Sequence, residues 1–242
     1  MTTADVDSAP RTFDVAAIAF DLDGTLLDTV HDLAASTNAL LAELGYAPLP
    51  LDAVRVLIGK GIPTLLRRAL AKASDVPVDA IDDATLADAL MRYHRHYSAS
   101  LGRETQAFPG MREGLDRLRD MGFPLAVITN KAQRYVRPHL EQAGIAGYFS
   151  LIVGGDTLAT RKPSAEPLLH VAQAFRIAPA QLLMIGDSGN DVDAARAAGC
   201  PVLVLPYGYN EGLPVQSLDA DGIVPSLAAV ADRVRRIAAE TT

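Results

Sequence analysis

The chain has 242 residues, of which 49% are hydrophobic, enough to build the packed core of one domain, or of one domain with a smaller inserted one. Its 22 Lys and Arg against 29 Asp and Glu give a formal net charge of −7, which argues against nucleic acid as a partner because that binding needs clustered positive charge. No apolar run approaches the length of a membrane span, and residues 1–11 lack the features of a signal peptide, so we expect a cytoplasmic protein with no membrane partner. The single cysteine, Cys200, excludes an intramolecular disulfide and is interpreted as a small packing residue.

The alternation of apolar runs and helical patterns indicates the fold class. Residues 1–13 are predicted to form a mobile tail, and the continuous apolar run over 15–20 then ends at Asp21. Such runs are typical of strands buried on both faces of a parallel sheet. Similar runs follow at 125–128, 151–153, 182–185 and 202–205, and helical patterns occur at 110–121, 132–143, 165–175 and 191–198. This order predicts an α/β fold with a doubly wound, Rossmann-like parallel sheet.

The interval from Asp28 to about Ala107 differs, because it holds no good strand candidate. Apolar residues at helical spacing predict a first helix that Gly45 ends, and further helices are predicted at 61–72 and 79–100. Roughly 80 helical residues are too many for an ordinary crossover between strands. The sequence therefore predicts a helical cap over residues 28–102, inserted into an α/β core formed by residues 14–27 and 103–242.

Four short polar segments carry the chemistry. They are Asp21-Leu22-Asp23-Gly24-Thr25, Thr129-Asn130-Lys131, Arg161-Lys162-Pro163 and Gly186-Asp187-Ser188-Gly189-Asn190-Asp191. Ligands of parallel sheets bind beyond the carboxyl ends of the strands, so we expect these segments to converge on one site. Together they supply carboxylates, a hydroxyl and an ammonium, the groups needed to break a phosphate ester with a metal ion. One segment alone would be a weak signal, since Asp-Gly after a strand is also a common turn.

In this order the segments resemble the motifs of the haloacid dehalogenase superfamily, in its Asp-x-Asp phosphatase branch, from about residue 15 to the C-terminus. The resemblance implies that Asp21 is the nucleophile and forms an aspartyl-phosphate, and that Asp23 is the general acid and base. It implies that Thr129 and Lys162 are catalytic and hold the phosphoryl oxygens, with Asn130 in a supporting position. The acid at Asp23 disfavours carbon–halogen cleavage, because the dehalogenases of the superfamily lack it.

A metal ion is expected at the same site. A carboxylate that approaches a phosphate meets repulsion of about 4 kcal/mol at roughly 4 Å and an effective dielectric near 20. A divalent cation and Lys162 would offset it, and Asp21 and Asp187 offer the hard oxygen ligands that Mg²⁺ prefers. The resemblance implies that the backbone carbonyl of Asp23 also binds the metal ion. It implies that Asp191 either binds the ion directly or supports the residues that bind it.

Two further segments bear on the substrate. Gly59-Lys60-Gly61 precedes a predicted helix whose first N–H groups attract anions, so a small carboxylate is expected to bind there; equally, the glycines could only separate two helices. Tyr207-Gly208-Tyr209-Asn210 follows the last long apolar run, and its other interpretation is a loop whose tyrosines pack on the body. Together these segments are similar to the bacterial members of the superfamily that hydrolyse 2-phosphoglycolate. The resemblance thus implies a small phosphorylated metabolite as partner and a role in carbohydrate metabolism, in glycolate biosynthesis.

Two alternatives remain open. A related small-metabolite phosphatase or phosphosugar mutase would share the core, and a mutase would pass the phosphoryl group to a sugar hydroxyl instead of releasing phosphate. A non-catalytic phosphate-binding protein would have no need of the second acid at Asp23. The sequence leaves the oligomeric state open.

Several other polar residues are given structural interpretations. Lys131 is predicted to be a surface lysine, and Arg67-Arg68 and Arg235-Arg236 are predicted to lie on the exposed faces of helices. His139 is interpreted as an ordinary helix residue, and His31 is placed near the cap hinge.

Overall fold

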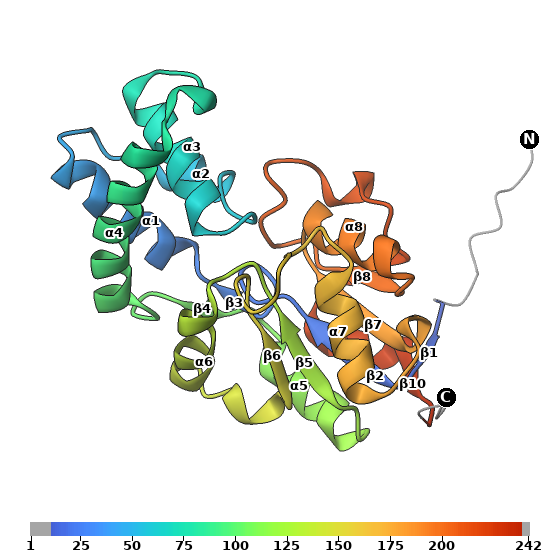
Figure 1. Cartoon of the computed structure of the whole chain (residues 1–242). Helices are drawn as coiled ribbons and strands as arrows, with labels where there is room; N and C mark the ends of the chain where they lie inside the picture. The colour runs from blue at the N-terminus through green and yellow to red at the C-terminus, as the bar shows by residue number, and fades with distance from the viewer. Residues whose placement is uncertain (1–10, 239–242) are drawn as a thin grey trace, which may run out of the picture.

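The computed structural model describes residues 11–238 and has a parallel sheet at its centre (Figure 1). Its six strands lie in the order β6-β5-β2-β7-β8-β9, and every neighbouring pair is parallel. The strands are β2 (Ala17–Phe20), β5 (Leu125–Ile128), β6 (Leu151–Val153), β7 (Leu182–Gly186), β8 (Val202–Val204) and β9 (Gly222–Ile223). The predicted α/β fold is confirmed. Only the two-residue β9 had not been anticipated from an apolar run, because so short an edge strand leaves little pattern.

Helices cover both faces of the sheet. On β2, Ile18 and Phe20 pack into one hydrophobic cluster, whereas Ala17 and Ala19 pack into another on the opposite face. The first cluster includes residues of α5 (Met111–Asp120), α6 (Gln133–Gln142) and α9 (Leu227–Val230), and the second includes residues of α7 (Glu166–Phe175) and α8 (Gly189–Ala198). Because successive side chains of a strand point to opposite faces, a strand between two helical layers must be apolar throughout. Cys200 is buried in the second cluster, as expected of a packing residue.

Four helices form the cap, at the upper left of Figure 1. They are α1 (Val30–Glu43), α2 (Leu51–Arg55), α3 (Ile62–Ser74) and α4 (Asp83–Ser100), with a 3₁₀ turn over Val78–Ala80. Their apolar faces share a third cluster, to which Tyr135 and Tyr209 of the core also contribute. The helix expected from residue 79 begins only at Asp83, because the Asp82 carboxylate accepts a hydrogen bond from the Thr85 N–H and caps the helix there.

The two linkers of the cap pair with each other. β3 (Leu27–Asp28) and β4 (Gln106–Ala107) form a short antiparallel pair, although this interval was predicted to hold no strand. Two residues on each side are too few to produce a recognisable alternation. We propose that the cap is bounded at residues 28 and 102 as predicted, since this pair closes the base of the insertion.

The two ends of the described chain meet in a second small sheet. β1 (Phe13–Val15) pairs in parallel with β10 (Val234–Arg236), and Phe13 is buried in the core. The tail was predicted to include Phe13, and that part of the prediction is wrong. Residues 1–10 of the predicted tail lie outside the described residues. Arg235 and Arg236 lie on a strand rather than a helix, and Arg235 pairs with Asp14 at 2.7 Å. Within residues 11–238, no helix combines the length and the apolar character needed to cross a membrane.

Candidate active site

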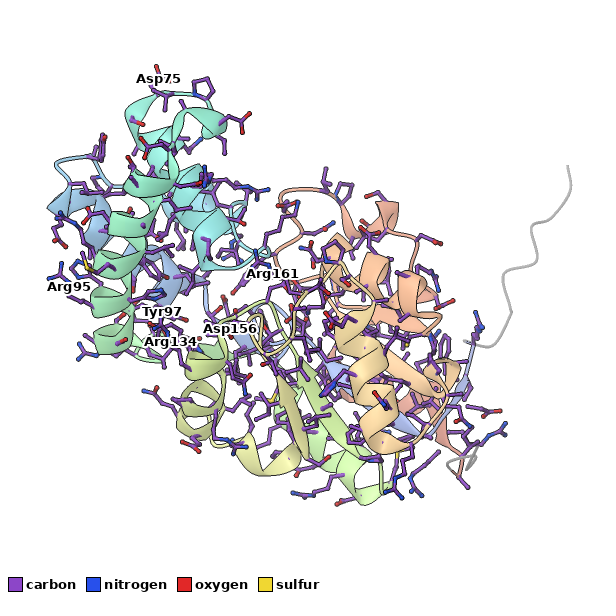
Figure 2. The ribbon with its side chains drawn as sticks, viewed as in Figure 1. Asp75, Arg95, Tyr97, Arg134, Asp156 and Arg161 are labelled. Carbon is purple, nitrogen blue, oxygen red and sulfur yellow. The ribbon has the colours of Figure 1, made fainter. Side chains whose placement is uncertain are left out.

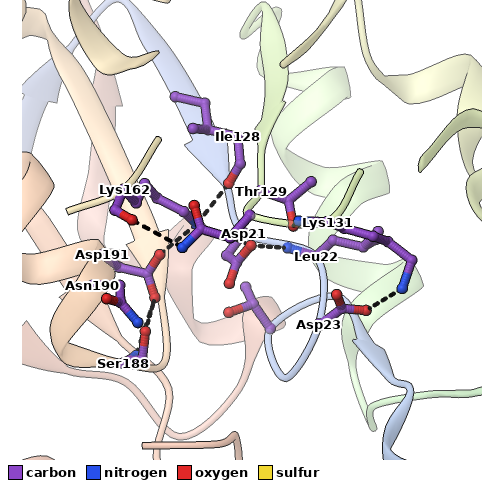
Figure 3. A network of polar contacts seen from close by, with 12 residues as sticks. Asp21, Leu22, Asp23, Ile128, Thr129, Lys131, Lys162, Ser188, Asn190 and Asp191 are labelled. Carbon is purple, nitrogen blue, oxygen red and sulfur yellow. Dashed lines mark hydrogen bonds and ion pairs between the residues drawn. The ribbon is translucent and has the colours of Figure 1, made fainter. Parts of the chain in front are cut away.

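The expected convergence takes place at the carboxyl ends of the strands. Phe20, the last residue of β2, is paired with Val127 of β5 on one side and with Ile185 of β7 on the other. Asp21, Thr129 and Asp187 follow these three neighbouring strands, so they come to one edge of the sheet although they are far apart in sequence. Figure 3 shows Asp21, Asp23, Thr129, Lys162 and Asp191 around this point.

Lys162 reaches the site from the loop after β6, and all of its donors are occupied. Its Nζ lies 2.9 Å from Asp21 Oδ1 and donates to Asp191 Oδ1 at 2.6 Å and to the Ile128 carbonyl at 2.7 Å. An ammonium has three N–H donors, so none is left over. Burial opposes the charge, but the carboxylates of Asp191 and Asp21 outweigh it and raise the pKa of Lys162. Lys162 is therefore a fixed cation beside Asp21.

Asp21 is a partly buried carboxylate with a fixed orientation. Its Oδ1 accepts a hydrogen bond from the Leu22 N–H at 2.7 Å, in addition to the contact with Lys162. Burial raises the pKa of Asp21 to about 6, against the pull of Lys162 and with the help of the neighbouring carboxylates Asp191 and Asp23. The Oδ2 oxygen of Asp21 takes part in neither contact. An oxygen without such partners suits a nucleophile.

Asp187 completes a cluster of acids that fits a divalent cation. Its Oδ1 accepts from the Thr25 hydroxyl and its Oδ2 from the Tyr209 N–H, each at 2.6 Å. One oxygen each of Asp21, Asp187 and Asp191 lie within 4.8 Å of one another. Burial, followed by repulsion from Asp191 and Asp21, raises the pKa of Asp187 well above its ordinary value. Positive charge stabilises the ionised form of carboxylates that lie this close together, and hard oxygen donors suit Mg²⁺.

Asp191 is engaged on both of its oxygens. Oδ1 accepts from Lys162, and Oδ2 accepts from the Ser188 hydroxyl at 2.8 Å and from the backbone N–H groups of Asp187 and Ser188. Asp191 thus holds both Lys162 and the loop that carries Asp187 at the start of α8. Asp191 was expected either to bind the metal ion directly or to support the residues that bind it. These contacts favour the supporting role.

Lys131 is not on the surface, so that prediction is wrong. Its side chain is 1% exposed, and its Nζ donates to Asp23 Oδ1 at 2.9 Å and to the hydroxyl of Tyr97 on α4. Burial would raise the pKa of Asp23, but the charge of Lys131 lowers it. The available signal was position: Lys131 directly follows Thr129-Asn130 at the carboxyl end of a buried strand.

A small cavity lies between the core and the cap. From the core it is lined by Asp21, Asp23, Thr129, Asn130 and Lys131, and from the cap by Leu33, Ile58, Gly59, Gly61, Ile62 and Leu65. Its volume is about 30 Å³. Asn130 connects the two sides, because its Nδ2 donates to the Gly59 carbonyl at 3.0 Å and to the Lys162 carbonyl at 2.9 Å. The cap therefore forms one wall of the cavity that Asp21 and Asp23 line.

The Gly59-Lys60-Gly61 segment is only partly at this cavity. Gly61 precedes α3 with a φ of 83°, and a Cβ there would come within 3.0 Å of the Asn130 carbonyl oxygen. The two glycines thus let the cap approach the core closely. Lys60 instead places its Nζ 3.1 Å from Glu211 Oε2, and it is not among the residues that line the cavity.

His139 is more than an ordinary helix residue. Its ring is 1% exposed; Nε2 lies 2.8 Å from the Thr105 hydroxyl, and that hydroxyl donates to Asp32 at 2.6 Å. Burial lowers the pKa of His139 to about 4, so the ring is neutral near pH 7. His139 on α6 is thereby joined to both ends of the cap insertion. His31 is the second residue of α1, close to the linker as expected.

Comparison with known proteins agrees with the geometry. The family model of the haloacid dehalogenase-like hydrolases matches residues 18–205. The chain is 48% identical over 213 residues to a phosphoglycolate phosphatase of Nitrosospira multiformis, covering 88% of this chain and 92% of the relative. It is 46% identical over 217 residues to a phosphoglycolate phosphatase of Thiobacillus denitrificans, with coverages of 90% and 94%.

A solved structure shares the whole architecture. The crystal structure of a predicted phosphoglycolate phosphatase from Haemophilus somnus matches with a TM-score of 0.84 at 32% identity, over 90% of this chain and 97% of that one. With the family match extending over most of the sheet and all of the cap, this chain belongs to the haloacid dehalogenase-like hydrolases.

Proposed function

We propose that this protein is a Mg²⁺-dependent phosphatase that hydrolyses 2-phosphoglycolate to glycolate and phosphate through an aspartyl-phosphate on Asp21. The observation that carries the proposal is the pair of carboxylates on one loop, with Asp21 held by Lys162 and Asp23 held by Lys131. The substrate is supported by the names of the relatives at 46% and 48% identity. The reaction would be a step of carbohydrate metabolism that forms glycolate.

In the first step an Asp21 oxygen attacks phosphorus, and the bond between phosphorus and the ester oxygen breaks. Asp23 gives its proton to the departing alkoxide, which leaves as glycolate. The charge of Lys162, 2.9 Å from Asp21, and the hydroxyl of Thr129 stabilise the phosphoryl oxygens during this transfer. The negative charge of the bound substrate favours the protonated form of Asp23, which this step needs.

In the second step water attacks the phosphorus of the aspartyl-phosphate. Asp23, now a carboxylate, takes a proton from that water, the bond between phosphorus and Asp21 breaks, and phosphate leaves. Lys131 lowers the pKa of Asp23 and so favours the carboxylate form that this step needs. One residue thus serves both steps, as acid and then as base.

Asp21 and Asp187 would hold the Mg²⁺, with the backbone carbonyl of Asp23 as a further ligand and Asp191 behind them. The close approach of three carboxylates, two of them buried, is the feature of this structure that fits such an ion. When bound, the cation offsets the repulsion between Asp21 and the phosphate.

The experiment that tests this proposal is to trap the phosphoryl group during turnover. Rapid acid quenching followed by peptide mass spectrometry is expected to find one phosphoryl group on the peptide that contains Asp21. Asp21→Asn should show no such mass and should lose roughly a thousandfold or more in kcat. Wild-type turnover in the Asp21→Asn protein, or phosphate on another side chain, would contradict the mechanism.

A further inference from the structure

The cavity contains one cation to which the reaction as described assigns no contact with the substrate. Among the residues that line it, all of them in the described part of the chain, Lys131 is the only one with a positively charged side chain. Burying an ammonium to 1% exposure is costly unless it is paired. The ion pair with Asp23 offsets part of the free-energy cost of burying the ammonium, and the hydroxyl of Tyr97 provides a second partner.

The hydrogen-bond donors of the two buried lysines differ. Lys162 places its Nζ against Asp191, Asp21 and the Ile128 carbonyl, which uses its three donors. Within residues 11–238, the Lys131 ammonium donates to two acceptors, Asp23 and Tyr97, so one of its N–H groups is left for a ligand in the cavity that it lines. Other cations near the entrance are placed differently: Lys60 pairs with Glu211, and Arg161, labelled in Figure 2, is exposed and belongs to a neighbouring hollow.

The position of Lys131 matches the shape of the proposed substrate. Asp23 must reach the ester oxygen to protonate it, and Lys131 Nζ is 2.9 Å from Asp23 Oδ1. In 2-phosphoglycolate one methylene separates the ester oxygen from the carboxylate, whose oxygens lie roughly 3 Å from the ester oxygen. A substrate whose ester oxygen meets Asp23 therefore brings its carboxylate within reach of the Lys131 ammonium.

The rest of the cavity gives the carboxylate no comparable partner. The cap supplies Leu33, Ile58, Ile62 and Leu65, which are apolar and confine the substrate without neutralising it. The carbonyl of Gly59 accepts from Asn130, so this part of the cap loop presents an acceptor rather than a donor toward the core. Asp21 and Asp23 repel an anion.

We infer that Lys131 binds the carboxylate of the substrate and makes the enzyme prefer phosphate esters of small 2-hydroxy acids over neutral esters. This inference rests on the proposed function and deepens it, because it names the residue that selects the substrate class. Tyr97 of α4 orients the ammonium from the cap side. Tyr97, labelled in Figure 2, packs against the core, because its ring is 4.9 Å from that of Tyr135 on α6.

The test compares two esters of the same shape, 2-phosphoglycolate and its neutral carboxamide, 2-phosphoglycolamide. Wild-type enzyme with Mg²⁺ is expected to show a higher kcat/KM for the carboxylate ester. Lys131→Met should reduce kcat/KM for both esters, because Asp23 loses its partner, but it should reduce it roughly ten- to hundredfold further for the carboxylate ester. The matched control Lys72→Met removes an exposed ammonium of α3 that does not line the cavity, and it should keep the preference.

The possible results separate the two proposals. An equal loss for both esters in Lys131→Met would mean that Lys131 acts on Asp23 alone, and it would overturn the inference while leaving the proposed function. If Lys131→Met does not fold, inhibition of the wild-type enzyme decides: glycolate is expected to inhibit more strongly than glycolamide, and equal inhibition would refute carboxylate binding. A wild-type enzyme that hydrolyses other phosphate esters but not 2-phosphoglycolate would overturn the proposed function itself.

Discussion

At the scale of single residues, Asp187 is held by its surroundings as well as by its hydrogen bonds. A Cβ on Gly208 would lie 2.2 Å from Asp187 Oδ2, and one on Gly24 would lie 2.5 Å from the same oxygen. Gly24 also has a φ of 93°, which a residue with a Cβ rarely adopts. Both glycines therefore permit the loops after β2 and β8 to close on this carboxylate.

Replacing Gly208 tests whether its close packing against Asp187 is needed for activity. Gly208→Ala forces Asp187 to move, and a displacement of about 1 Å at a reacting group costs roughly a hundredfold in rate. We expect a loss of about that size in kcat/KM, together with weaker Mg²⁺ binding measured by calorimetry. Gly147→Ala is the matched control, because a Cβ at Gly147 meets nothing within 4 Å. Unchanged rate and metal affinity in Gly208→Ala would show that Asp187 does not need this position.

Single residues are also where prediction from the sequence was least complete. The positions of Asp21, Thr129 and Asp187 could be predicted, because each follows an apolar strand and the strands are parallel. The burial of Lys131 and His139 was not predicted, since it is completed by contacts with Tyr97, Asp32 and Thr105 that have no local pattern in the sequence.

At the scale of elements, one tyrosine joins the loop after β8 to the first helix of the cap. α1 begins after Thr29, whose side chain makes no capping hydrogen bond. The hydroxyl of Tyr209 instead accepts from the N–H groups of Thr29 at 2.8 Å and Val30 at 3.0 Å, and it donates to Asp28. The backbone N–H of Tyr209 also donates to Asp187, so the acid cluster and the start of the cap share this residue.

Tyr209→Phe should therefore destabilise the protein more than an ordinary loss of a hydroxyl. It leaves the buried Thr29 N–H without an acceptor and leaves the Val30 N–H only a 3.4 Å contact to Asp28 Oδ1, at a cost of about 1–3 kcal/mol in the free energy of unfolding. Urea denaturation measures this cost. The control is Tyr207→Phe, whose hydroxyl makes only a long contact of 3.3 Å to the Thr25 carbonyl. Equal stabilities of the two variants would contradict the capping role.

The longer strands could be predicted from the sequence, and the shortest ones could not. The five long apolar runs all became strands, because a strand buried on both faces must be apolar at every position. The short pairs β3–β4 and β1–β10 were missed, since each is formed by two or three residues and is specified by its partner rather than by its own pattern.

At the scale of the whole molecule, the site exists only where the cap and the core meet. The core supplies every carboxylate of the acid cluster, and the cap supplies the apolar wall and Tyr97. The sequence predicted a cap from the helical interval, but how it closes depends on contacts such as Asn130 to Gly59, across 71 residues. Contacts of that range follow from tertiary packing and leave no local pattern.

The most direct test of the account is phosphate release from 2-phosphoglycolate, glucose phosphates and p-nitrophenyl phosphate, each measured with Mg²⁺ and with a chelator. We expect rapid release from 2-phosphoglycolate that the chelator abolishes and Mg²⁺ restores, with much slower release from the bulkier esters, because the cap side chains that line the cavity are apolar and offer the hydroxyl groups of a sugar no hydrogen bond. Faster release from a sugar phosphate, or release from 2-phosphoglycolate that persists in the chelator, would contradict the central claim.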